Sequence, residues 1–424
     1  MRFQTLDEWL SWQEGLHPTA MDLGLTRVRI AAGKMDWPAP SFPQITVAGT
    51  NGKGSSVSYL EAILTAQGYK VGTYTSPHLV RYNERIRVNG EPVEDGAICD
   101  AFHRIDLARG DMTITYFEFG TLAAMDVFHQ MSVDVAVMEV GIGGELDAVN
   151  IFDADVALIT AIDIDHQKWL GSDRETIGLQ KAGIMRAKRP VIVSDPKPPK
   201  SVLDKAVELE APLYQLGVDY RLASRDLDWD WIGPTNQLAE LPAPGLKGDF
   251  QRNNAAGAIM ALMCLAPTLS VSRNAISRGL ASPGLKGRFE TIGTRPEVIV
   301  DVGHNPHATK VLAENLETRP SHGRTIAVAG LLVDKNINDA VKPVVPQVDE
   351  WFITGLEGPR GDDGSKLAEG LSMAGAEHVS RFSDGLSAFE AAMKAAGEAD
   401  RVVVFGSFYL VGDVLAHATH LVHE

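Results

Sequence analysis

The sequence predicts an α/β fold with two domains, each built on a parallel-rich sheet. Short apolar runs that fit buried strands alternate with longer runs of helical apolar spacing, a pattern typical of βαβ units and parallel sheets. The chain has 424 residues, and domains usually hold roughly 100–200 residues. A glycine-containing segment, PGLKG at 283–287, separates two such series of strands and helices. Together these observations predict two successive α/β domains.

The apolar periodicity predicts the individual elements of both series. In the first series we expect strands at 44–49, 70–76, 134–141, 155–162 and 189–195, and helices at 55–69, 115–130 and 174–186. The segment 196–246 is richer in Pro, Trp and Asp and has weak periodicity, so we expect a peripheral excursion there. In the second series we expect strands at 297–303, 324–330, 350–355 and 401–406.

Composition excludes several classes of protein. Hydrophobic residues make up 45% and charged residues 22%, which is typical of a folded globular chain. The 55 acidic and 39 basic side chains give a net charge of −16, which disfavours nucleic acid and anionic membranes as partners. Two cysteines make no disulfide framework. No apolar stretch approaches the ~20 residues that span a bilayer, and we expect no signal peptide at the start, so the sequence predicts a cytoplasmic protein.

The strongest local signal is GTNGKGS at 49–55, between a predicted strand and a predicted helix. Glycines let backbone N–H groups approach phosphates, and a helix N-terminus attracts anions. Lys53 adds a positive charge, and Ser55 can reach Mg²⁺. The spacing departs from the common phosphate-loop pattern because Gly54 separates Lys53 from Ser55. The motif predicts a phosphate-binding loop, with a simple glycine turn that opens a helix as the alternative.

Side chains that bind metals follow two neighbouring predicted strands. Glu139 ends the strand at 134–141, and His166 follows the strand at 155–162. Ligands of open α/β sheets bind at the carboxyl ends of the strands, and Mg²⁺ usually completes its shell with water and phosphate. With Ser55, these residues form an incomplete shell for a divalent ion. Taken singly, Glu139 can be a solvated acid and His166 a hydrogen-bonded structural histidine.

Three further sequence features each allow a functional and a structural interpretation. GIGG at 141–144 is not a dinucleotide fingerprint, because Leu146 stands where the last glycine is needed, so the sequence excludes NAD. Lys181 lies on a predicted helix, where a lysine is usually at the surface. DVGHNPHA at 301–308 puts Asp301 and His304 at a strand end, either as part of a site or as a polar turn that caps a helix.

Together these motifs resemble the Mur ligase superfamily and, within it, the branch of bacterial bifunctional dihydrofolate synthases/folylpolyglutamate synthases. The resemblance runs over almost the whole chain. It is carried by LHPTAMDLGLTRV, VAGTNGKGSS, YTSPHLVRYNERIRVNG, TYFEFGTLAAM, MEVGIGGELDAVNI, DIDHQKWLGSDRETIGLQKAGI, LKGRFE, DVGHNPHA and FGSF. It implies an N-terminal P-loop-type ATPase domain that binds ATP and pterin over 1–287, and a C-terminal Rossmann-like α/β ligase domain over 288–424.

The resemblance implies an ATP-dependent amide ligase. ATP would phosphorylate a carboxylate to an acyl phosphate, and the amine of L-glutamate would displace the phosphate. The carboxylate would belong to 7,8-dihydropteroate or to the terminal glutamate of a reduced folate. Lys53 and Mg²⁺ fit this chemistry, because they neutralise charge at the transferring phosphoryl group. The resemblance also implies a monomer, and a monovalent cation is a further candidate cofactor.

The resemblance also implies roles for individual residues. The nucleotide would be bound by Thr50, Asn51, Gly52, Lys53, Gly54, Ser55, Asn254, Arg288 and Asp301. Mg²⁺ would be held by Ser76, Glu139 and His166. The pterin would be bound by Thr115, Tyr116, Phe117, Glu118, Leu146, Asp147 and Ala148. The catalytic candidates are Lys53, Lys181 and His304, and Lys181 matches a lysine that relatives carry as a carbamate, which is an anion.

Three charged positions depart from the usual pattern of this branch. Glu145 stands where arginine is common, Gln180 replaces a common glutamate, and Lys168 replaces an acidic or neutral residue. One explanation, which we favour because the metal and phosphate residues are intact, is compensation, for example by a Glu145–Lys168 pair that replaces an arginine–acid contact. The other is lost or retuned activity, because a carboxylate near bound phosphates disfavours an anionic substrate. The alternatives to a bifunctional ligase are a ligase with one of the two activities and a nucleotide-binding regulatory protein without turnover.

Overall fold

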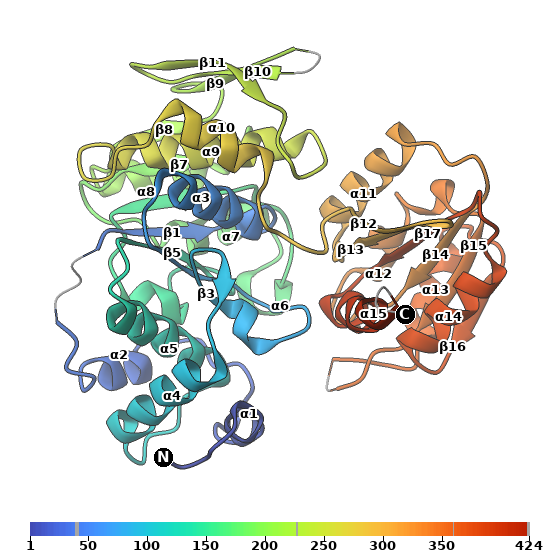
Figure 1. Ribbon diagram of the computed structural model, residues 1–424, viewed down its shortest axis with the longest axis horizontal. Helices are drawn as coiled ribbons and strands as arrows, with labels where there is room; N and C mark the ends of the chain where they lie inside the picture. The colour runs from blue at the N-terminus through green and yellow to red at the C-terminus, as the bar shows by residue number, and fades with distance from the viewer. Residues whose placement is uncertain (39–41, 226–227, 359, 422–424) are drawn as a thin grey trace. The chain divides into compact units, whose positions relative to one another are not determined.

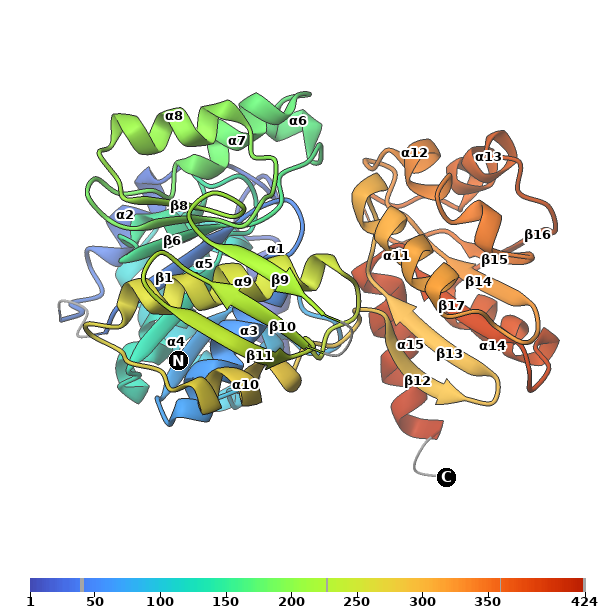
Figure 2. The same cartoon turned by 90° about the horizontal axis from the view of Figure 1, so that it is seen from above.

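A computed structural model of the chain describes residues 1–38, 42–225, 228–358 and 360–421. It divides into two compact units (Figures 1 and 2). The first unit comprises Met1–His78, Tyr82–Gly245 and Asp249–Gly284, and the second comprises Leu79–Arg81, Leu246–Gly248 and Leu285–Glu424. Each unit has its own sheet, so the predicted α/β fold with two parallel-rich sheets is confirmed.

The first unit is built on an eight-stranded sheet in the order β4-β3-β2-β5-β1-β6-β7-β8. Its strands are β1 Gln44–Ala48, β2 Val71–Tyr74, β3 Ile86–Val88, β4 Glu91–Pro92, β5 Val135–Glu139, β6 Val156–Ile159, β7 Val191–Val193 and β8 Leu213–Gln215. Only the β2–β3 and β3–β4 pairings are antiparallel among the pairings of this sheet in the described chain. Every residue of β1 and β5 is buried, as expected for parallel strands covered on both faces. The carboxyl ends of β1, β5 and β6 therefore lie side by side at one edge.

Helices cover both faces of this sheet. They are α1 Leu6–Glu14, α2 Thr26–Ala32, α3 Lys53–Gln67, α4 Asp95–Arg109, α5 Tyr116–Met131, α6 Gln167–Leu170, α7 Arg174–Ala182, α8 Lys200–Glu208, α9 Phe250–Leu265 and α10 Arg273–Ala281, with short 3₁₀ turns at Tyr82–Arg85 and Ala148–Ile151. Figure 1 shows α3, α9 and α10 on one face and α4 and α5 on the other. The aromatic side chains of Trp9, Phe102 and Phe119 form part of the core that joins α1, α4 and α5.

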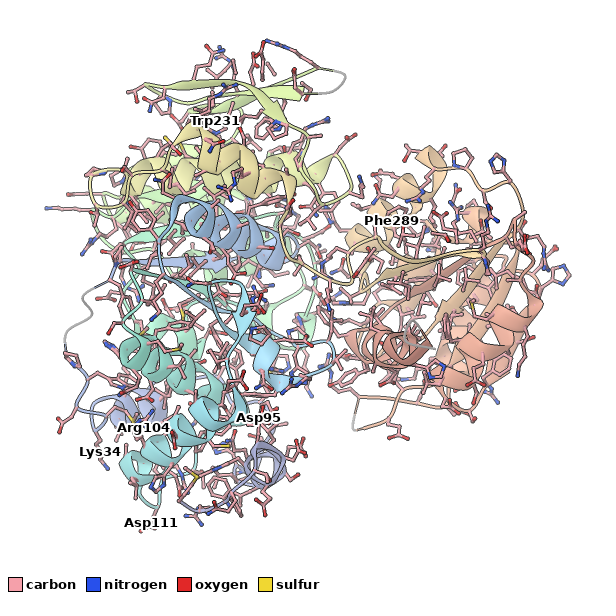
Figure 3. The ribbon with its side chains drawn as sticks, viewed as in Figure 1. Lys34, Asp95, Arg104, Asp111, Trp231 and Phe289 are labelled. Carbon is pink, nitrogen blue, oxygen red and sulfur yellow. The ribbon has the colours of Figure 1, made fainter. Side chains whose placement is uncertain are left out.

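The predicted excursion at 196–246 contains a second, small sheet. Its three antiparallel strands, β9 Arg221–Ser224, β10 Asp228–Ile232 and β11 Gln237–Pro242, lie beyond α9 and α10 in Figure 1. Trp229 and Trp231 are fully buried. Trp231, which is labelled in Figure 3, donates its indole N–H to the Ala256 carbonyl of α9 at 3.2 Å. The first part of the predicted excursion is instead part of the main fold, because it forms α8 and the edge strand β8 of the eight-stranded sheet. The small sheet alone is peripheral, and it packs on the outer side of α9.

The second unit is built on a six-stranded sheet in the order β12-β13-β17-β14-β15-β16. Its strands are β12 Glu290–Thr294, β13 Glu297–Asp301, β14 Thr325–Ala329, β15 Glu350–Thr354, β16 Val379–Phe382 and β17 Arg401–Phe405, and its helices are α11 Pro306–Thr318, α12 Ile337–Val341, α13 Ser365–Met373, α14 Gly385–Ala395 and α15 Phe408–Leu421, with a 3₁₀ turn at Val345–Gln347. All pairings are parallel except that of β12 with β13. One core joins the sheet to α11, α12 and α13, and the other joins it to α14 and α15.

The lengths and apolar content of the helices bear on whether any of them could span a lipid bilayer. In the part of the chain that the structure describes, no helix is both long enough and apolar enough to cross a membrane.

Candidate functional site

The glycine loop, residues 49–55, follows β1 and runs into α3. Two of its glycines are required by close approach. A methyl group on Gly49 would lie 1.8 Å from Thr160 Oγ1, and one on Gly52 would lie 2.5 Å from Asn254 Oδ1. Gly52 also has φ +90°, a left-handed conformation that glycine adopts without steric cost. The loop is therefore packed so closely that these two positions admit only glycine without rearrangement.

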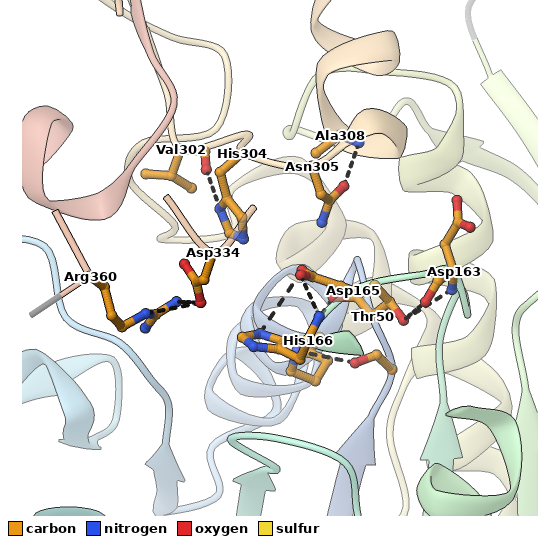
Figure 4. A network of polar contacts seen from close by, with 12 residues as sticks. Thr50, Asp163, Asp165, His166, Val302, His304, Asn305, Ala308, Asp334 and Arg360 are labelled. Carbon is orange, nitrogen blue, oxygen red and sulfur yellow. Dashed lines mark hydrogen bonds and ion pairs between the residues drawn. The ribbon is translucent and has the colours of Figure 1, made fainter. Parts of the chain in front are cut away.

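The backbone of the glycine loop is tied to the segment that follows β6. The N–H groups of Thr50 and Asn51 donate to the Ala161 carbonyl at 2.8 and 3.2 Å. The Thr160 hydroxyl donates to the Asn51 carbonyl at 2.8 Å. The Thr50 hydroxyl donates to the Asp163 carbonyl at 2.9 Å and accepts from the Asp163 N–H at 3.0 Å (Figure 4). These bonds fix the loop shape within the protein itself.

Three residues with predicted roles meet beside this loop. Lys53 Nζ donates to the Gly49 carbonyl at 3.2 Å and lies 4.0 Å from Glu139 Oε1. Glu139 ends β5 with its side chain buried, and its Oε2 accepts the Ser76 N–H at 3.4 Å. The positive end of the α3 dipole also points toward this region. The result is a lysine, a carboxylate and a hydroxyl-bearing residue at one edge of the sheet.

His166 immediately precedes the short helix α6, as its N-cap residue, with φ +50°. Its backbone N–H donates to Asp165 Oδ1 at 2.7 Å, and its ring Nε2 lies 4.0 Å from Asp165 Oδ2 (Figure 4). Within the described residues, no group of three or more His, Cys, Asp or Glu side chains could hold a metal ion. Of the residues predicted to hold Mg²⁺, the structure joins Ser76 and Glu139, whereas His166 contacts Asp165. Carboxylate and hydroxyl oxygens suit Mg²⁺, which takes most of its ligands from water and phosphate. These residues do not make the preformed cage that a structural metal requires.

Lys181 is buried on α7 and reaches the same loop. Its Nζ donates to the Gly49 carbonyl at 2.9 Å, so one carbonyl accepts from two lysines, Lys181 and Lys53. Burial and, next, the charge of Lys53 lower the pKa of Lys181 to about 7. A substantial fraction of this side chain is therefore the neutral, nucleophilic amine near neutral pH. The alternative of an ordinary surface lysine is excluded.

An aromatic ring and a carboxylate converge near the end of β5. A methyl group on Gly141 would lie 2.6 Å from Phe117 Cζ and 3.2 Å from Asp147 Oδ2. Phe117 is held at the start of α5, where Thr115 and Glu118 form a capping box through bonds of 2.7 and 3.2 Å. The two segments predicted to bind a pterin therefore meet at Gly141.

Asp147 is a buried carboxylate with an unusual titration. Its oxygens accept the N–H groups of Ile142 at 3.0 Å and Val149 at 2.9 Å. Burial raises the pKa of Asp147 to about 6, although the backbone N–H bonds and the charge of Lys53 act in the opposite direction. The neighbouring Leu146 is 43% exposed. The turn thus combines a buried acceptor with an exposed apolar tip.

The predicted Glu145–Lys168 pair is wrong. Both side chains are exposed and described, and no ion pair joins them. The Glu145 backbone N–H donates to the Gln180 carbonyl at 2.8 Å, which fixes the turn and leaves the side chain pointing outward. Lys168 instead has its Nζ 5.8 Å from the Trp169 ring centroid. Both residues stand next to site motifs in the sequence, but that position did not predict where their side chains point.

Helix α9 contacts the loop from a third direction. Gln251 Nε2 donates to Ser55 Oγ at 3.2 Å, and Gln251 Oε1 accepts from Asn254 Nδ2 at 3.0 Å. All three side chains are buried. Asn254 was predicted at the nucleotide, and its oxygen lies against Gly52. The start of α9 therefore contacts the middle and the C-terminal end of the glycine loop.

Three other predicted residues lie together within the second unit. Asp301 ends β13 and accepts two backbone N–H groups at 2.9 and 2.7 Å. Burial raises its pKa, against the lowering effect of the Arg288 charge. The Arg288 guanidinium lies 5.3 Å from the Phe408 ring, and the His304 ring lies 6.4 Å from that ring. His304 Nδ1 is also 2.9 Å from a backbone carbonyl (Figure 4). A basic, an acidic and an imidazole side chain thus share one part of this unit.

Comparison with known proteins assigns the family. Residues 47–219 match the Mur ligase middle domain, and residues 287–408 match the Mur ligase glutamate ligase domain. The dihydrofolate synthase/folylpolyglutamate synthase of Escherichia coli K12 is 45% identical over 410 residues, covering 97% of this chain and 94% of that protein. The chain belongs to the Mur ligase family of dihydrofolate synthases/folylpolyglutamate synthases.

Solved structures of this Mur ligase family have the same fold. E. coli FolC in complex with DHPP and ADP superposes with a TM-score of 0.92 at 44% identity, covering 99% of this chain and 98% of that one. A bifunctional folylpolyglutamate synthase/dihydrofolate synthase with Mn, AMPPNP and L-glutamate bound gives a TM-score of 0.90 at 42% identity, covering 98% of each chain. The predicted family and ligase class are confirmed.

Two side chains that hold the Mur ligase glycine loop were missed by sequence reasoning. Thr160 is fully buried in a predicted strand end, where a threonine gives no signal of its own. Gln251 stands three residues before Asn254 on α9, and residues at this spacing share one helix face. That spacing, applied to a residue already predicted at the site, could have found Gln251.

Proposed function

We propose that the protein is an ATP-dependent ligase that joins L-glutamate to 7,8-dihydropteroate, giving dihydrofolate, and to reduced folates, giving folylpolyglutamates. The observation that carries the proposal is that the glycine loop and the two segments assigned to the acceptor lie at the ends of neighbouring strands. Lys53, which follows β1, lies 4.0 Å from Glu139 at the end of β5, and Phe117 and Asp147 meet at Gly141, two residues after that strand end. Extensive identity to the E. coli enzyme supports the same activity.

On the nucleotide side, the proposal assigns phosphate binding to the glycine loop. Thr50, Asn51, Gly52, Lys53, Gly54 and Ser55 would contact the phosphates of ATP. Ser76, Glu139 and His166 would hold Mg²⁺, which would neutralise charge on the transferring phosphoryl group when bound. Lys53 adds a fixed positive charge from the first turn of α3, where the helix dipole also favours anions.

On the acceptor side, the proposal assigns the pteridine ring to the two segments that meet at Gly141. Phe117 would offer an aromatic face for stacking. Asp147 is ionised above its pKa of about 6, and its carboxylate can then accept N–H groups of the pteridine. Thr115, Tyr116, Glu118, Leu146 and Ala148 would complete this binding site. The carboxylate of the bound acceptor would then extend toward the glycine loop.

The reaction needs two anions to meet. The acceptor carboxylate would attack the γ-phosphoryl group of ATP, releasing ADP and forming an acyl phosphate. The L-glutamate amine would then displace phosphate to form the amide and lose a proton.

The proposal divides this work between an ATP- and pterin-binding domain at 1–287 and a ligase domain at 288–424. Asn254, Arg288 and Asp301 would contact ATP, with His304 near the nucleotide. Holding the reactants together supplies much of the rate enhancement.

We also propose that Lys181 is carbamylated. Its neutral amine can add to CO₂ and release one proton, which turns the side chain into an anion. The lowered pKa of about 7 supports this reaction at neutral pH. Isotopically labelled bicarbonate should give a carbamate carbon signal by NMR in the wild type. The signal should be absent in Lys181→Arg, whose guanidinium stays protonated. An unchanged spectrum in the wild type refutes this modification.

The deciding experiment measures ADP release with dihydropteroate and, separately, with tetrahydrofolate, each with and without L-glutamate. We expect glutamate-dependent release with both acceptors. Release with one acceptor alone indicates a single-activity ligase, and tight ATP binding without turnover indicates the regulatory alternative. Lys53→Ala and Glu139→Ala should abolish turnover, because they remove the cation and the carboxylate at the phosphate loop.

A further inference from the structure

Gln251 makes the connection between α9 and the glycine loop described above, and no role has so far been given to it. Its side chain is 1% exposed. Both ends of its amide are used, because Nε2 donates to Ser55 Oγ at 3.2 Å and Oε1 accepts from Asn254 Nδ2 at 3.0 Å. An amide with both ends engaged is restrained in position. In the structure Gln251 presents its N–H to the Ser55 hydroxyl.

That orientation determines what Ser55 can do. A serine hydroxyl has one hydrogen to donate and two lone pairs to accept with. The Gln251 N–H occupies one lone pair and cannot accept the hydroxyl hydrogen. The second lone pair is left for a cation, and the hydrogen is left for an anionic oxygen. This is the arrangement that a hydroxyl needs beside a metal-bound phosphate.

The helix that carries Gln251 is well placed to hold such an orientation. On its inner side, a methyl group on Gly257 would lie 2.7 Å from Ser194 Cβ, so α9 packs closely on the main sheet. On its outer side, Trp231 bonds to the Ala256 carbonyl at 3.2 Å. The Asn254 side chain that orients Gln251 also lies against Gly52. The side chain that contacts Ser55 is thus carried by a helix that is packed on both sides.

We propose that Gln251 is a positioning residue that sets the Ser55 hydroxyl for the complex of a divalent cation with the nucleotide phosphates. The inference rests on the proposed function, because it takes the glycine loop as the nucleotide site. A positioning role differs from a purely structural role of the Gln251–Ser55 bond. A bond that only joined α9 to α3 would hold the loop equally for metal-free and metal-bound nucleotide. The metal dependence of nucleotide binding therefore separates the two roles.

The test measures ADP binding by calorimetry in excess Mg²⁺ and in EDTA. The quantity of interest is the ratio of the two dissociation constants, the metal-dependent gain. In Gln251→Met, which keeps the length of the side chain without a donor, we expect this gain to fall about fivefold, the size of one net hydrogen bond. Binding in EDTA should stay within about twofold of wild type. Gln251→Asn keeps the amide but is too short to reach Ser55, and it should lose the same gain.

Ser55→Ala and the double variant Ser55→Ala/Gln251→Met identify the route of the effect. If Gln251 acts through Ser55, the double variant should lose no more of the gain than Ser55→Ala alone. Ser58→Ala is the matched control on α3, because its buried hydroxyl makes no hydrogen bond within the described residues. Its metal-dependent gain should equal that of wild type. Thermal unfolding of every variant verifies that it is folded.

Three results would overturn the inference. The first is an unchanged gain in both Gln251 variants, and the second is an unchanged gain in Ser55→Ala. The third is an equal loss of affinity with and without metal, which indicates a structural bond only. If Gln251→Met does not fold, Gln251→Asn decides alone. Failure of the wild type to bind ADP in either condition would instead count against the proposed function.

Discussion

The glycine loop (49–55) and the turn at 141–148 follow neighbouring strands of one sheet, but their surroundings are opposite. The loop is held from three directions, by the segment after β6, by Lys181 on α7 and by α9. The turn is anchored at Asp147, whereas Glu145 and Leu146 at its tip are exposed. If the loop binds phosphate as proposed, its fixed shape suits a group that is the same in every ATP. The exposed tip can change its charge at little cost in stability.

The largest effect should come from Gly49→Ala. The added methyl group would overlap Thr160 Oγ1, at 1.8 Å. We expect the free energy of unfolding to fall by about 1–3 kcal/mol, and ADP affinity to fall with it, as measured by denaturant titration and calorimetry. Gly96→Ala is the control, because a methyl group there meets nothing within 4 Å. Wild-type affinity in Gly49→Ala would mean that the loop adapts more freely than its packing indicates.

The second prediction concerns Lys181→Met and the pH dependence of stability. The pKa of Lys181 falls from 10.5 to about 7 in the folded state. Between these values the unfolded chain binds more protons, so wild-type stability should gain as pH rises, by up to about 1.4 kcal/mol per pH unit from this group. Lys181→Met lacks the group and should lack this gain. Urea titrations from pH 7 to 9 in CO₂-free buffer measure the free energy of unfolding of both proteins. Parallel plots of this free energy against pH for wild type and variant would contradict the prediction.

The third prediction addresses the buried end of the turn. Because the pKa of Asp147 is raised to about 6, its carboxylate is protonated below that pH and loses acceptor capacity. The KM for dihydropteroate should therefore rise as pH falls below about 6 in wild type. Asp147→Asn should remove this dependence and raise the KM at pH 7 about tenfold, the size of a lost hydrogen bond to a charged group. The KM for ATP serves as the internal control and should change little.

The smallest effect is expected at the tip of the turn. Glu145→Gln should change the free energy of unfolding by less than about 0.5 kcal/mol, because the side chain is exposed. The KM for anionic acceptors should fall about twofold at low salt and recover at high salt. Lys168→Gln combined with Glu145→Gln should be additive in stability, since no ion pair joins the two residues. An interaction free energy above about 0.5 kcal/mol in this double-mutant cycle would indicate that the two side chains do pair.

The sequence predicted elements best where their burial is uniform. β1, β5, β14 and β17 are buried along their whole length, and each appears as a continuous apolar run. β9, β11 and β16 are largely exposed, so they lack such a run and were not predicted. Their pairing depends on neighbours distant in sequence, which periodicity does not report.

Site residues follow the same division. Lys53 and Gly52 were predicted at the site because loop chemistry restricts the residue types at those positions. Gln251 and Thr160 were missed, because their importance comes from side chains that meet only in the folded chain. The Glu145–Lys168 pairing was wrong for the same reason, since charge alone does not fix a direction. Motif chemistry predicts which groups a site needs, and packing determines what holds them.

The small sheet β9–β11 has a consequence for the whole first unit. Its buried Trp231 is bonded to the backbone of the helix that carries Gln251 and Asn254. Local opening of this sheet would uncover α9, so we expect the sheet and the glycine loop to belong to one cooperative unit. Amide hydrogens of β10 and α9 should then exchange together, and should slow together when nucleotide binds. A segment with weak periodicity in the sequence thus supports the helix that contacts the glycine loop.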